Sequence, residues 1–309
     1  MSNFGIAIHG GAGTLIKGLM TEALESQYKM ALKNTLVTGY DLLEKGSTAL
    51  HVVEMVVKAL EDSPLFNAGK GAVFTAEGTH EMDASIMDGK TLNAGAVSLV
   101  TGIKNPVVLA RDVMQKSNHV FLAGEGALQF AKSNGYAIES PDYFYDELRY
   151  WQWQEIKGGD GFQLDHTVKK DSKFGTVGAV ACDQNGNIAA ATSTGGMTNK
   201  KWGRVGDSPM IGAGVYANNK TCAVSCTGSG EFFIRGVVAY DVSCLMEHKG
   251  LSLKKAADEV IYKRILEING DGGLIAIDSK GNIAMPFNTE GMYRACKSYS
   301  GIEEISIYK

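Results

Sequence analysis

The strand-like runs of this chain are short, bounded by glycine-rich turns, and arranged as hairpins between pairs of helix-like segments. Strand patterns occupy Phe4–His9, parts of 66–89, 93–100, Thr176–Cys182, Asn187–Thr194, Cys222–Thr227 and a hairpin over 272–287. Apolar residues at helical spacing predict helices at Glu22–Glu44, Thr48–Glu61, Pro106–Lys116, Gly124–Ser133, Glu231–His248 and Leu253–Leu266. Successive hairpins favour an α+β fold, a four-layer αββα sandwich of two stacked, mainly antiparallel sheets flanked by helices, over a doubly wound parallel sheet.

Composition and charge fit a single globular domain over residues 1–309. The chain is 44% apolar and 21% charged, and its net charge of −4 is too small to favour nucleic acid or an anionic membrane as a partner. The N-terminus lacks the basic and apolar regions of a secretory signal, and no apolar stretch nears the length of a membrane span. We therefore expect a cytoplasmic protein.

The cysteines bear on disulfides and metal sites, whereas the glycines bear on turns and close backbone contacts. The five cysteines are odd in number and show no CxxC spacing, which favours buried free thiols over a metal site. Cys222 and Cys226 are four apart in a strand pattern and should share a face. The 38 glycines cluster beside strand runs, where they permit tight turns and a close approach of backbone to a ligand.

Two glycine-rich stretches resemble nucleotide-binding motifs but lack essential residues. "HGGAG", after the first strand, does not have the GxGxxG spacing, and "AGKGAVF" has Gly71 where a phosphate loop needs serine or threonine. The six histidines are scattered, without metal-ligand spacing. His9 ends a buried strand beside glycines, which leaves two interpretations open: it shapes a site, or it is a hydrogen-bonded core histidine.

The stretch "KFGTVGA" begins a buried strand abruptly at a Gly-Thr pair. It follows a polar segment, about 141–175, that we expect to hold a short helix and then a mobile linker. Cleavage between Gly175 and Thr176 would leave Thr176 with its hydroxyl beside its own α-amine. That amine has a reference pKa of about 7.7–8.0, so it can act as the base that a threonine nucleophile needs. The same hydroxyl could make the cut by attacking the Gly175 carbonyl, where a residue without Cβ tolerates strained backbone.

Other residues could complete an active site around Thr176. Arg204 offers a planar fork to a carboxylate and Asp207 can hold an ammonium, which together suit an α-amino acid head group. Thr194 could orient the nucleophile, and "TGSG" at 227–230 supplies a hydroxyl and a glycine N–H for an oxyanion. Each feature alone is weak, because such threonines are usually structural and such pairs usually lie on the surface.

Taken together, these segments resemble the plant-type L-asparaginase / isoaspartyl peptidase (beta-aspartyl-peptidase) family of N-terminal nucleophile (Ntn) threonine hydrolases. The matching stretches run through nearly the whole chain: "IAIHGGAGT", "FNAGKGAVF", "MDASIMDG", "NAGAVSLV", "FGTVGAVACDQNGNIAAATSTGGMTNK", "GRVGDSP", "GAGVYANN", "VSCTGSGEFFIR", "GGLIAID" and "PFNTEGMYRA". Their joint occurrence in this order is highly specific.

The resemblance implies autocatalytic cleavage into an alpha subunit, 1–175, and a beta subunit, 176–309, and a dimer of these alpha-beta heterodimers. It implies Thr176 as nucleophile, Thr194 as its supporting hydroxyl, and Thr227 with Gly228 as oxyanion hole. The implied substrate-binding residues are Asn67, Arg204, Val205, Gly206, Asp207, Thr227, Gly228, Ser229 and Gly230. No cofactor is required, although the loop Leu60–Lys70 resembles one that holds a structural Na⁺ with main-chain carbonyls.

The implied reaction is hydrolysis of beta-aspartyl dipeptides and L-asparagine, which releases L-aspartate. An alternative is a glycosylasparaginase-type amidase of the same fold, but that branch normally carries aspartate where this chain has Gly175, and it is secreted with disulfides. A further alternative is an uncleaved, non-catalytic binding protein.

Overall fold

Two β-sheets form the centre of the molecule in the computed structural model, which describes residues 3–158 and 175–309. In spatial order the larger sheet contains β12 (Glu303–Tyr308), β11 (Gly291–Ser298), β1 (Gly5–Gly13), β5 (Val177–Cys182), β6 (Ile188–Thr194), β2 (Met82–Asp88), β3 (Ala94–Val100) and β4 (Phe121–Ala123). The smaller contains β10 (Ile283–Ala284), β9 (Gly272–Asp278), β8 (Cys222–Gly228) and β7 (Val215–Ala217). Only β3 and β4 pair in parallel among these strands, so the prediction of mainly antiparallel sheets is confirmed.

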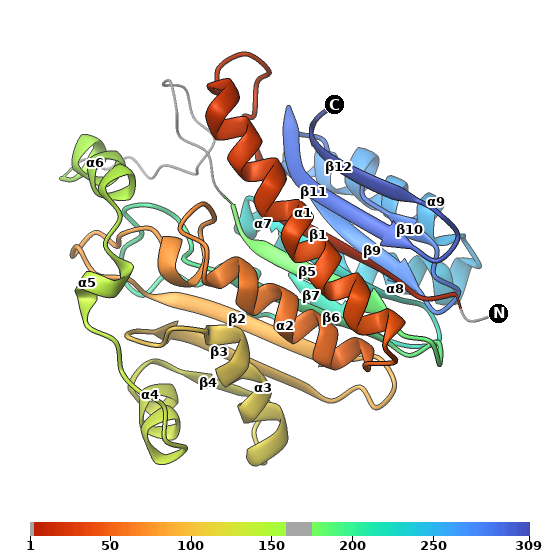
Figure 1. The fold of residues 1–309 in the computed structure, drawn as a ribbon, viewed down its shortest axis with the longest axis horizontal. Helices are drawn as coiled ribbons and strands as arrows, with labels where there is room; N and C mark the ends of the chain where they lie inside the picture. Colours follow the sequence, from red (N-terminus) through yellow and green to blue (C-terminus); the bar gives the residue numbers. More distant parts are fainter. Residues whose placement is uncertain (1–2, 159–174) are drawn as a thin grey trace.

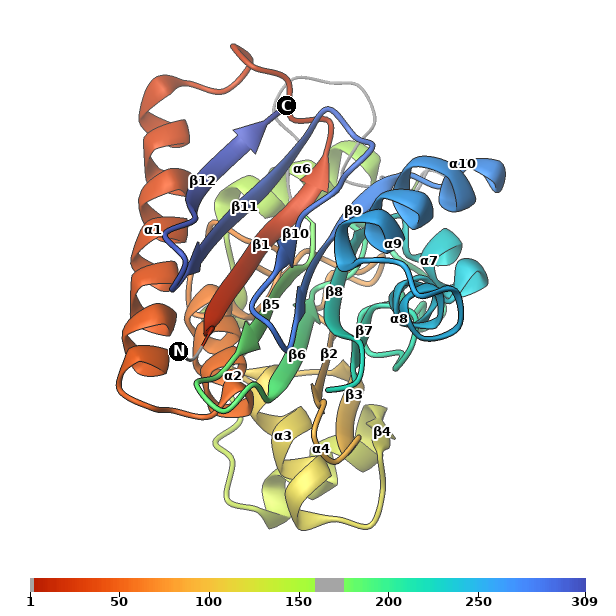
Figure 2. The ribbon, with the colours of Figure 1, turned by 90° about the vertical axis from the view of Figure 1, so that its right-hand side faces the viewer.

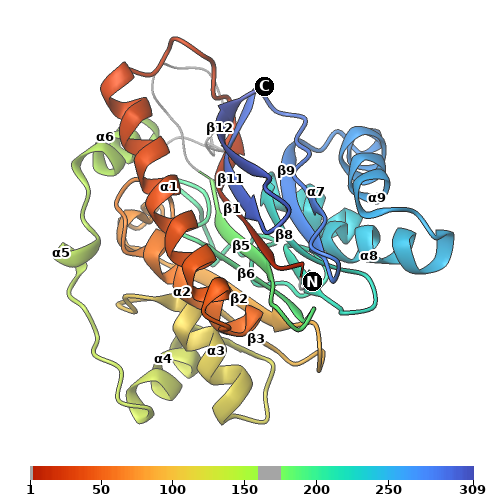
Figure 3. The ribbon, with the colours of Figure 1, turned by 45° about the vertical axis from the view of Figure 1, so that its right-hand side comes forward.

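Helices cover the outer face of each sheet, as the predicted αββα sandwich requires (Figure 1, Figure 2). The larger sheet is covered by α1 (Glu22–Glu44), α2 (Ala49–Glu61) and α3 (Pro106–Lys116), with α4 (Gly124–Ser133) near its β3 edge. The smaller sheet is covered by α8 (Val238–Lys249) and α9 (Leu253–Glu259), accompanied by α7 (Gly230–Gly236) and α10 (Ile265–Glu267). The helices α5 (Pro141–Phe144) and α6 (Glu147–Ile156) lie at the edge away from α8 and α9 (Figure 3).

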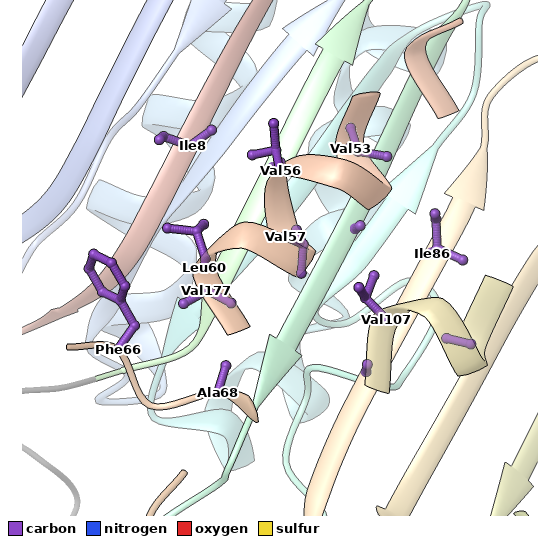
Figure 4. Packing of buried hydrophobic residues seen from close by; sticks show 14 of the residues in the cluster. Ile8, Val53, Val56, Val57, Leu60, Phe66, Ala68, Ile86, Val107 and Val177 are labelled. Carbon is purple, nitrogen blue, oxygen red and sulfur yellow. The ribbon is translucent and has the colours of Figure 1, made fainter. Parts of the chain in front are cut away.

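Alternation along each strand divides its side chains between two cores. On β5, Val177 and Ala179 face the helices, whereas Val180 and Cys182 face the smaller sheet. Figure 4 shows the helix-side core, where Val56 and Leu60 of α2 pack towards Val177. The space between the sheets is lined mainly by small side chains, many of them alanines. Any polar side chain on an inward position of these strands is therefore buried between the sheets.

Most predicted elements are confirmed, and the differences lie at their ends. The helix predicted from Thr48 begins at Ala49, because Thr48 is its N-cap and its side chain accepts from the backbone N–H of His51 at 3.3 Å. The first strand continues through "GGAG" to Gly13 instead of ending at His9. It does so through an irregularity in its pairing with β11 at Gly10, which inserts one residue between His9 and Gly11.

The C-terminal half departs more from expectation. The single helix predicted at Glu231–His248 is broken at Val237, whose φ of 48° is left-handed. The helix predicted at Leu253–Leu266 includes a π-helical turn at Val260–Arg264. Strands β11 and β12 lie where no strand was predicted, although β11 pairs with β1 along almost its whole length. This pairing joins residues nearly 300 positions apart, so no local sequence pattern predicts it.

Several other expectations can be compared with the described residues. The predicted short helix after Pro141 corresponds to α5 and α6, whereas most of the predicted linker, 159–174, lies outside the described residues. All five cysteines are free, and Cys222 and Cys226 face the same core, as predicted. Among the described helices, none is both long and apolar enough to cross a membrane.

Candidate active site

Five polar side chains project from neighbouring strands into the space between the sheets. They are His9 of β1, Thr192 and Thr194 of β6, and Ser225 and Thr227 of β8, and each is at most 3% exposed. Each alternates with residues that face the helices, such as Ile8, Ala191 and Cys226. Strand periodicity thus gathers a polar cluster in an otherwise apolar layer. Buried polar groups of this kind need partners, and the partners define the site.

Thr176 lies one residue before β5, at the end of this cluster. Its side chain is buried, and its Oγ1 is 3.4 Å from the hydroxyl oxygen of Ser208. Its carbonyl oxygen accepts a hydrogen bond from Nδ1 of His9 at 2.9 Å. Val177 pairs with Ser193 on β6, so Thr176 and Thr194 follow at adjacent ends of the two strands. The predicted nucleophile and its predicted supporting hydroxyl therefore belong to the same sheet edge.

Gly175 needs to be glycine because of crowding. An added Cβ would lie 2.9 Å from Oγ1 of Thr227 and 3.0 Å from Cα of Gly11. Its φ is not in the left-handed region, so the strained backbone that the sequence suggested is not what requires glycine here. Gly175 is consequently packed next to the hydroxyl of Thr227. That hydroxyl accepts from the Ala12 N–H at 3.3 Å, which leaves its own proton available to donate.

Thr194 and Asn67 are joined through a glycine turn. The Thr194 hydroxyl accepts from the N–H of Gly196 at 3.0 Å, and Nδ2 of Asn67 donates to the Gly196 carbonyl at 2.7 Å. Oδ1 of Asn67 accepts from Val73 N–H at 3.1 Å, and Gly195 has no room for a Cβ, which would lie 2.4 Å from that oxygen. Asn67 thus shapes the turn after Thr194. The Thr194 hydroxyl acts as an acceptor in this turn, so its own proton is not used there.

Arg204 and Asp207 converge on Gly230, at the start of α7. A Cβ on Gly230 would lie 2.9 Å from Oδ1 of Asp207 and 3.0 Å from Nη2 of Arg204. Only glycine lets the backbone approach both charges so closely. The two residues and the glycine that the sequence assigned to an amino-acid head group are therefore brought together.

The charge state of Asp207 depends on its surroundings. Its side chain is 3% exposed, and Oδ2 has no hydrogen-bond partner among the described residues. Burial raises the pKa of Asp207 to about 7, against the opposing charge of Arg204. A buried carboxylate with a free oxygen is poorly compensated on its own. It is suited to a cationic ligand that supplies the missing donor.

Glu231 is a site residue that the sequence analysis missed. Nε and Nη2 of Arg204 donate to its two carboxylate oxygens at 2.8 and 2.9 Å, a bidentate pair. Burial alone would raise the pKa of Glu231, but the hydrogen bonds and charge of Arg204 hold it below the ordinary value. The position of Glu231, directly after "TGSG", was the available signal. The pair aligns the guanidinium, whose Nη1 lies 2.9 Å from where a Cβ on Gly206 would be.

The remaining predicted residues occupy the loops around this pair. Gly228 has a φ of 150°, and an added Cβ would lie 2.4 Å from the Asp271 carbonyl. Ser229 is buried and donates its hydroxyl to the carboxylate of Asp271, which anchors the "TGSG" turn. Val205 is half-buried beside Gly206. Ser208 is the second residue that sequence reasoning missed, since nothing in "GRVGDSP" marks it as a neighbour of Thr176.

Comparisons with known proteins cover almost the entire chain. The profile of the asparaginase family Asparaginase_2 matches residues 2–307. An isoaspartyl peptidase of Salmonella typhimurium is 54% identical over 293 residues, covering 94% of each chain. A probable isoaspartyl peptidase/L-asparaginase 2 of Arabidopsis thaliana is 41% identical over 330 residues, and the match covers both chains completely. A plant-type L-asparaginase of Pyrococcus abyssi is 42% identical over 297 residues, and the match covers 93% of this chain and 94% of the relative. The family resemblance inferred from the sequence is confirmed, and the chain belongs to the asparaginase family Asparaginase_2.

Proposed function

We propose that this protein is a self-cleaving threonine hydrolase that hydrolyses beta-aspartyl dipeptides and L-asparagine and releases L-aspartate. The observation that carries the proposal is the buried Thr176 hydroxyl at the end of a polar cluster, with Gly175 packed against Thr227. The names of the relatives, isoaspartyl peptidase and L-asparaginase, support the same chemistry.

Cleavage of the chain comes first in this mechanism. The Thr176 hydroxyl attacks the Gly175 carbonyl carbon, the C–N bond breaks, and Gly175 is left as an ester on Thr176 Oγ1. Water then hydrolyses the ester to give an alpha subunit, 1–175, and a beta subunit, 176–309. The contact between Gly175 and Thr227 supports this step, since the Thr227 hydroxyl can donate to the oxygen that becomes negative.

Turnover uses the new α-amine of Thr176 as the general base. The amine accepts the hydroxyl proton, Oγ1 attacks the side-chain carbonyl of the substrate, and an acyl-enzyme forms as ammonia or an amino acid leaves. Water releases aspartate in the second half-reaction. Thr194 orients the nucleophile, and Thr227 with the Gly228 backbone stabilises each tetrahedral oxyanion.

Substrate binding follows from the two charged residues next to Gly230. Arg204, aligned by Glu231, attracts the α-carboxylate, and the free oxygen of Asp207 accepts from the α-ammonium. Val205, Gly206 and Ser229 shape the loops around this head group. Because both charges lie next to Gly230, the arrangement suits the head group of an α-amino acid and leaves the side-chain amide for Thr176.

Substrate affinity should depend on pH through Asp207. Its pKa of about 7 means that in the free enzyme the carboxyl binds a proton below neutral pH and loses the charge that attracts ammonium. We therefore expect KM for L-asparagine to rise about tenfold for each pH unit below about 7. The bound ammonium keeps Asp207 ionised, so Asp207 should add no pH dependence to kcat, which follows protonation of the Thr176 α-amine instead. Initial rates at pH 5.5 to 8 check this, and a KM that stays constant over that range would contradict it.

The loop Leu60–Lys70 fits a Na⁺ ion held by main-chain carbonyls. A Cβ on Gly71 would lie 2.1 Å from the Phe66 carbonyl oxygen and 2.7 Å from that of Pro64, and one on Gly69 would lie 2.4 Å from the Glu61 carbonyl oxygen. The two glycines thus let backbone approach three carbonyl oxygens of this loop, and such oxygens are the ligand type that hard cations prefer. When bound, such an ion would hold the loop in shape and take no part in the reaction.

The sodium proposal predicts a cation-specific stabilisation. The melting temperature should be higher in NaCl than in choline chloride of equal ionic strength, because only Na⁺ fits between carbonyls. Gly71→Ala places a methyl group against two of these oxygens and should abolish the difference between the salts. Gly126→Ala, where an added Cβ meets nothing within 4 Å, is the matched control and should retain it. Equal melting temperatures of the wild type in both salts would exclude the ion.

We further propose that two alpha-beta units assemble into a heterotetramer in the cytoplasm and that neither nucleic acid nor membrane is a partner. The family resemblance supports the assembly, and the small net charge of −4 supports the absence of polyanionic partners. Light scattering of the purified protein tests the assembly, and a mass of one alpha-beta unit would contradict it.

The decisive experiment for the proposed function combines intact mass with two assays. Mass spectrometry of the purified protein should give two chains that separate between Gly175 and Thr176. The same sample should release aspartate from beta-aspartyl-leucine and from L-asparagine. An uncut chain that hydrolyses either substrate would contradict the amine-base mechanism, and a cut chain without either activity would contradict the substrate assignment.

A further inference from the structure

His9 lies where β1 stops supporting β5. The two strands pair antiparallel from Gly5 with Cys182 to His9 with Gly178, and the pairing goes no further. At the next position β1 has its irregularity at Gly10, and Gly11 then lies close to Gly175, since an added Cβ on Gly11 would be 2.5 Å from the Gly175 nitrogen. The carbonyl of Thr176 therefore lies beyond the last residue pair between β1 and β5.

Beyond this pairing, the side chain of His9 donates a hydrogen bond to the Thr176 carbonyl. Its Nδ1 is 2.9 Å from the Thr176 carbonyl oxygen, and its Nε2 is 2.9 Å from Oγ of Ser225. A carbonyl only accepts, so Nδ1 must carry a proton. Burial lowers the pKa of His9 to about 3, although the bond to Thr176 opposes this, so the ring is neutral and Nε2 is an acceptor.

Two hydroxyls hold His9 in this tautomer. Ser225 must donate its proton to Nε2, and it can accept from Thr192, whose Oγ1 is 2.7 Å away. Thr192 also lies 3.2 Å from the Gly214 carbonyl, which limits its rotation. The resulting chain runs from Thr192 through Ser225 and His9 to Thr176. The proton positions follow for His9 and Ser225, whereas the single hydroxyl proton of Thr192 has two acceptors, the Ser225 hydroxyl and the Gly214 carbonyl.

The packing around this chain leaves no room for another arrangement. A Cβ on Gly178 would lie 2.0 Å from Oγ of Ser225 and 2.4 Å from Nε2 of His9, so Gly178 must be glycine for the bond to exist. His9, Thr192 and Ser225 are all completely buried. A buried network with all its partners satisfied is rigid.

We propose that His9 is a positioning residue for the nucleophile, and that Ser225 and Thr192 hold its ring in the tautomer that donates to the Thr176 carbonyl. This inference rests on the proposed function. Once the bond before Thr176 is cut, that residue is a chain end that could fray, and the bond from Nδ1 anchors it next to β5. His9 touches neither substrate nor the reacting atoms and acts through the backbone of Thr176.

Two amide substitutions separate positioning from core filling. The amide nitrogen of asparagine is as many bonds from Cα as Nδ1, and that of glutamine as many as Nε2. His9→Asn can therefore still donate to Thr176, whereas His9→Gln keeps only the contact with Ser225. We expect kcat to fall about 100-fold in His9→Gln and less than about tenfold in His9→Asn, with KM within about twofold of wild type in both.

Activity is measured on beta-aspartyl-leucine per mole of cut chain, with the cut fraction taken from intact mass. Ser225→Ala removes the hydroxyl that holds the His9 tautomer and should lower kcat. Ser243→Ala is the control, because it removes a hydroxyl from another buried pair, in which Ser243 lies 2.6 Å from Thr221, and it should lower only the melting temperature. Equal losses of kcat in His9→Asn and His9→Gln, or losses that follow the melting temperature across all four variants, would overturn the proposal.

One measurement is independent of activity. ¹⁵N NMR of the His9 ring in the wild-type protein should show Nδ1 protonated and Nε2 unprotonated across neutral pH, and the opposite tautomer would overturn the proposal even in an inactive protein. Wild-type protein that hydrolyses neither substrate would contradict the proposed function instead, and the NMR result would still decide the role of His9.

Discussion

Thr176→Ala is expected to leave the chain as a single 309-residue species and to lower turnover of beta-aspartyl-leucine by about 10⁴-fold or more. The substitution removes the hydroxyl that attacks Gly175 and that would later attack the substrate. It therefore blocks formation of the α-amine base as well as the acyl-enzyme. Denaturing electrophoresis reports the cut, and aspartate release reports turnover.

Thr176→Ser is the matched variant for this prediction, because it keeps the hydroxyl and removes only a methyl group. Serine should still cut the chain and retain measurable activity, at a lower level since Thr176 is buried and its methyl helps to restrict the rotamer. Two subunits of the expected masses in the alanine variant, or turnover by that variant close to wild type, would remove Thr176 from its proposed role.

Thr227→Val should lower kcat by about 10²- to 10³-fold while KM changes little. Valine has nearly the shape of threonine but cannot donate to an oxyanion, so the loss is confined to the transition state. The Thr227 hydroxyl is well placed for this donation because its own acceptor function is used by the Ala12 N–H. Slower chain cleavage is expected for the same reason, since Gly175 packs against this hydroxyl. Steady-state kinetics per mole of cut chain measure the first effect, and a time course of cleavage measures the second.

Thr221→Val provides the control for this second prediction. Thr221 immediately precedes the same strand, is buried, and bonds to Ser243. Its loss should reduce stability by about 1 kcal/mol without a selective effect on kcat. A Thr227→Val enzyme with wild-type kcat, or one whose loss lies only in KM, would show that the oxyanion is stabilised elsewhere.

The predictions of helices and strands were correct where the sequence signal was local. Helices α1, α3 and α4 have the bounds that apolar spacing and end signals predicted, since Pro106 can begin a helix and Gly46 adopts the left-handed φ that ends one. The end of β1 was missed because its pairing continues past the glycines through an irregularity that only the partner strand reveals. The break at Val237 was missed because valine rarely adopts a positive φ, and nothing local marks it.

The same distinction between local and long-range signals applies to the residues of the candidate site. Residues with a distinctive chemical type in a distinctive segment, such as Arg204 and Asp207 in "GRVGDSP", could be proposed from the sequence, and the structure brings these two together at Gly230. Ser208, Glu231 and the hydrogen-bonded chain behind Thr176 could not, because serines, glutamates and a lone histidine are common and acquire a role only through their neighbours. Ser225 is 216 positions from His9, and only the stacking of two sheets brings them to 2.9 Å.

The sequence by itself determined the sandwich, the hydrolase family and the threonine at the candidate cut, because strand and helix periodicities and short glycine-rich motifs are local properties of the chain. Only the tertiary structure decided why Gly175 must be glycine, which carboxylate aligns Arg204, and which side chain supports the Thr176 carbonyl. These depend on close approaches between strands that are far apart in the sequence. Periodicity predicts which face a side chain occupies but not what it meets there.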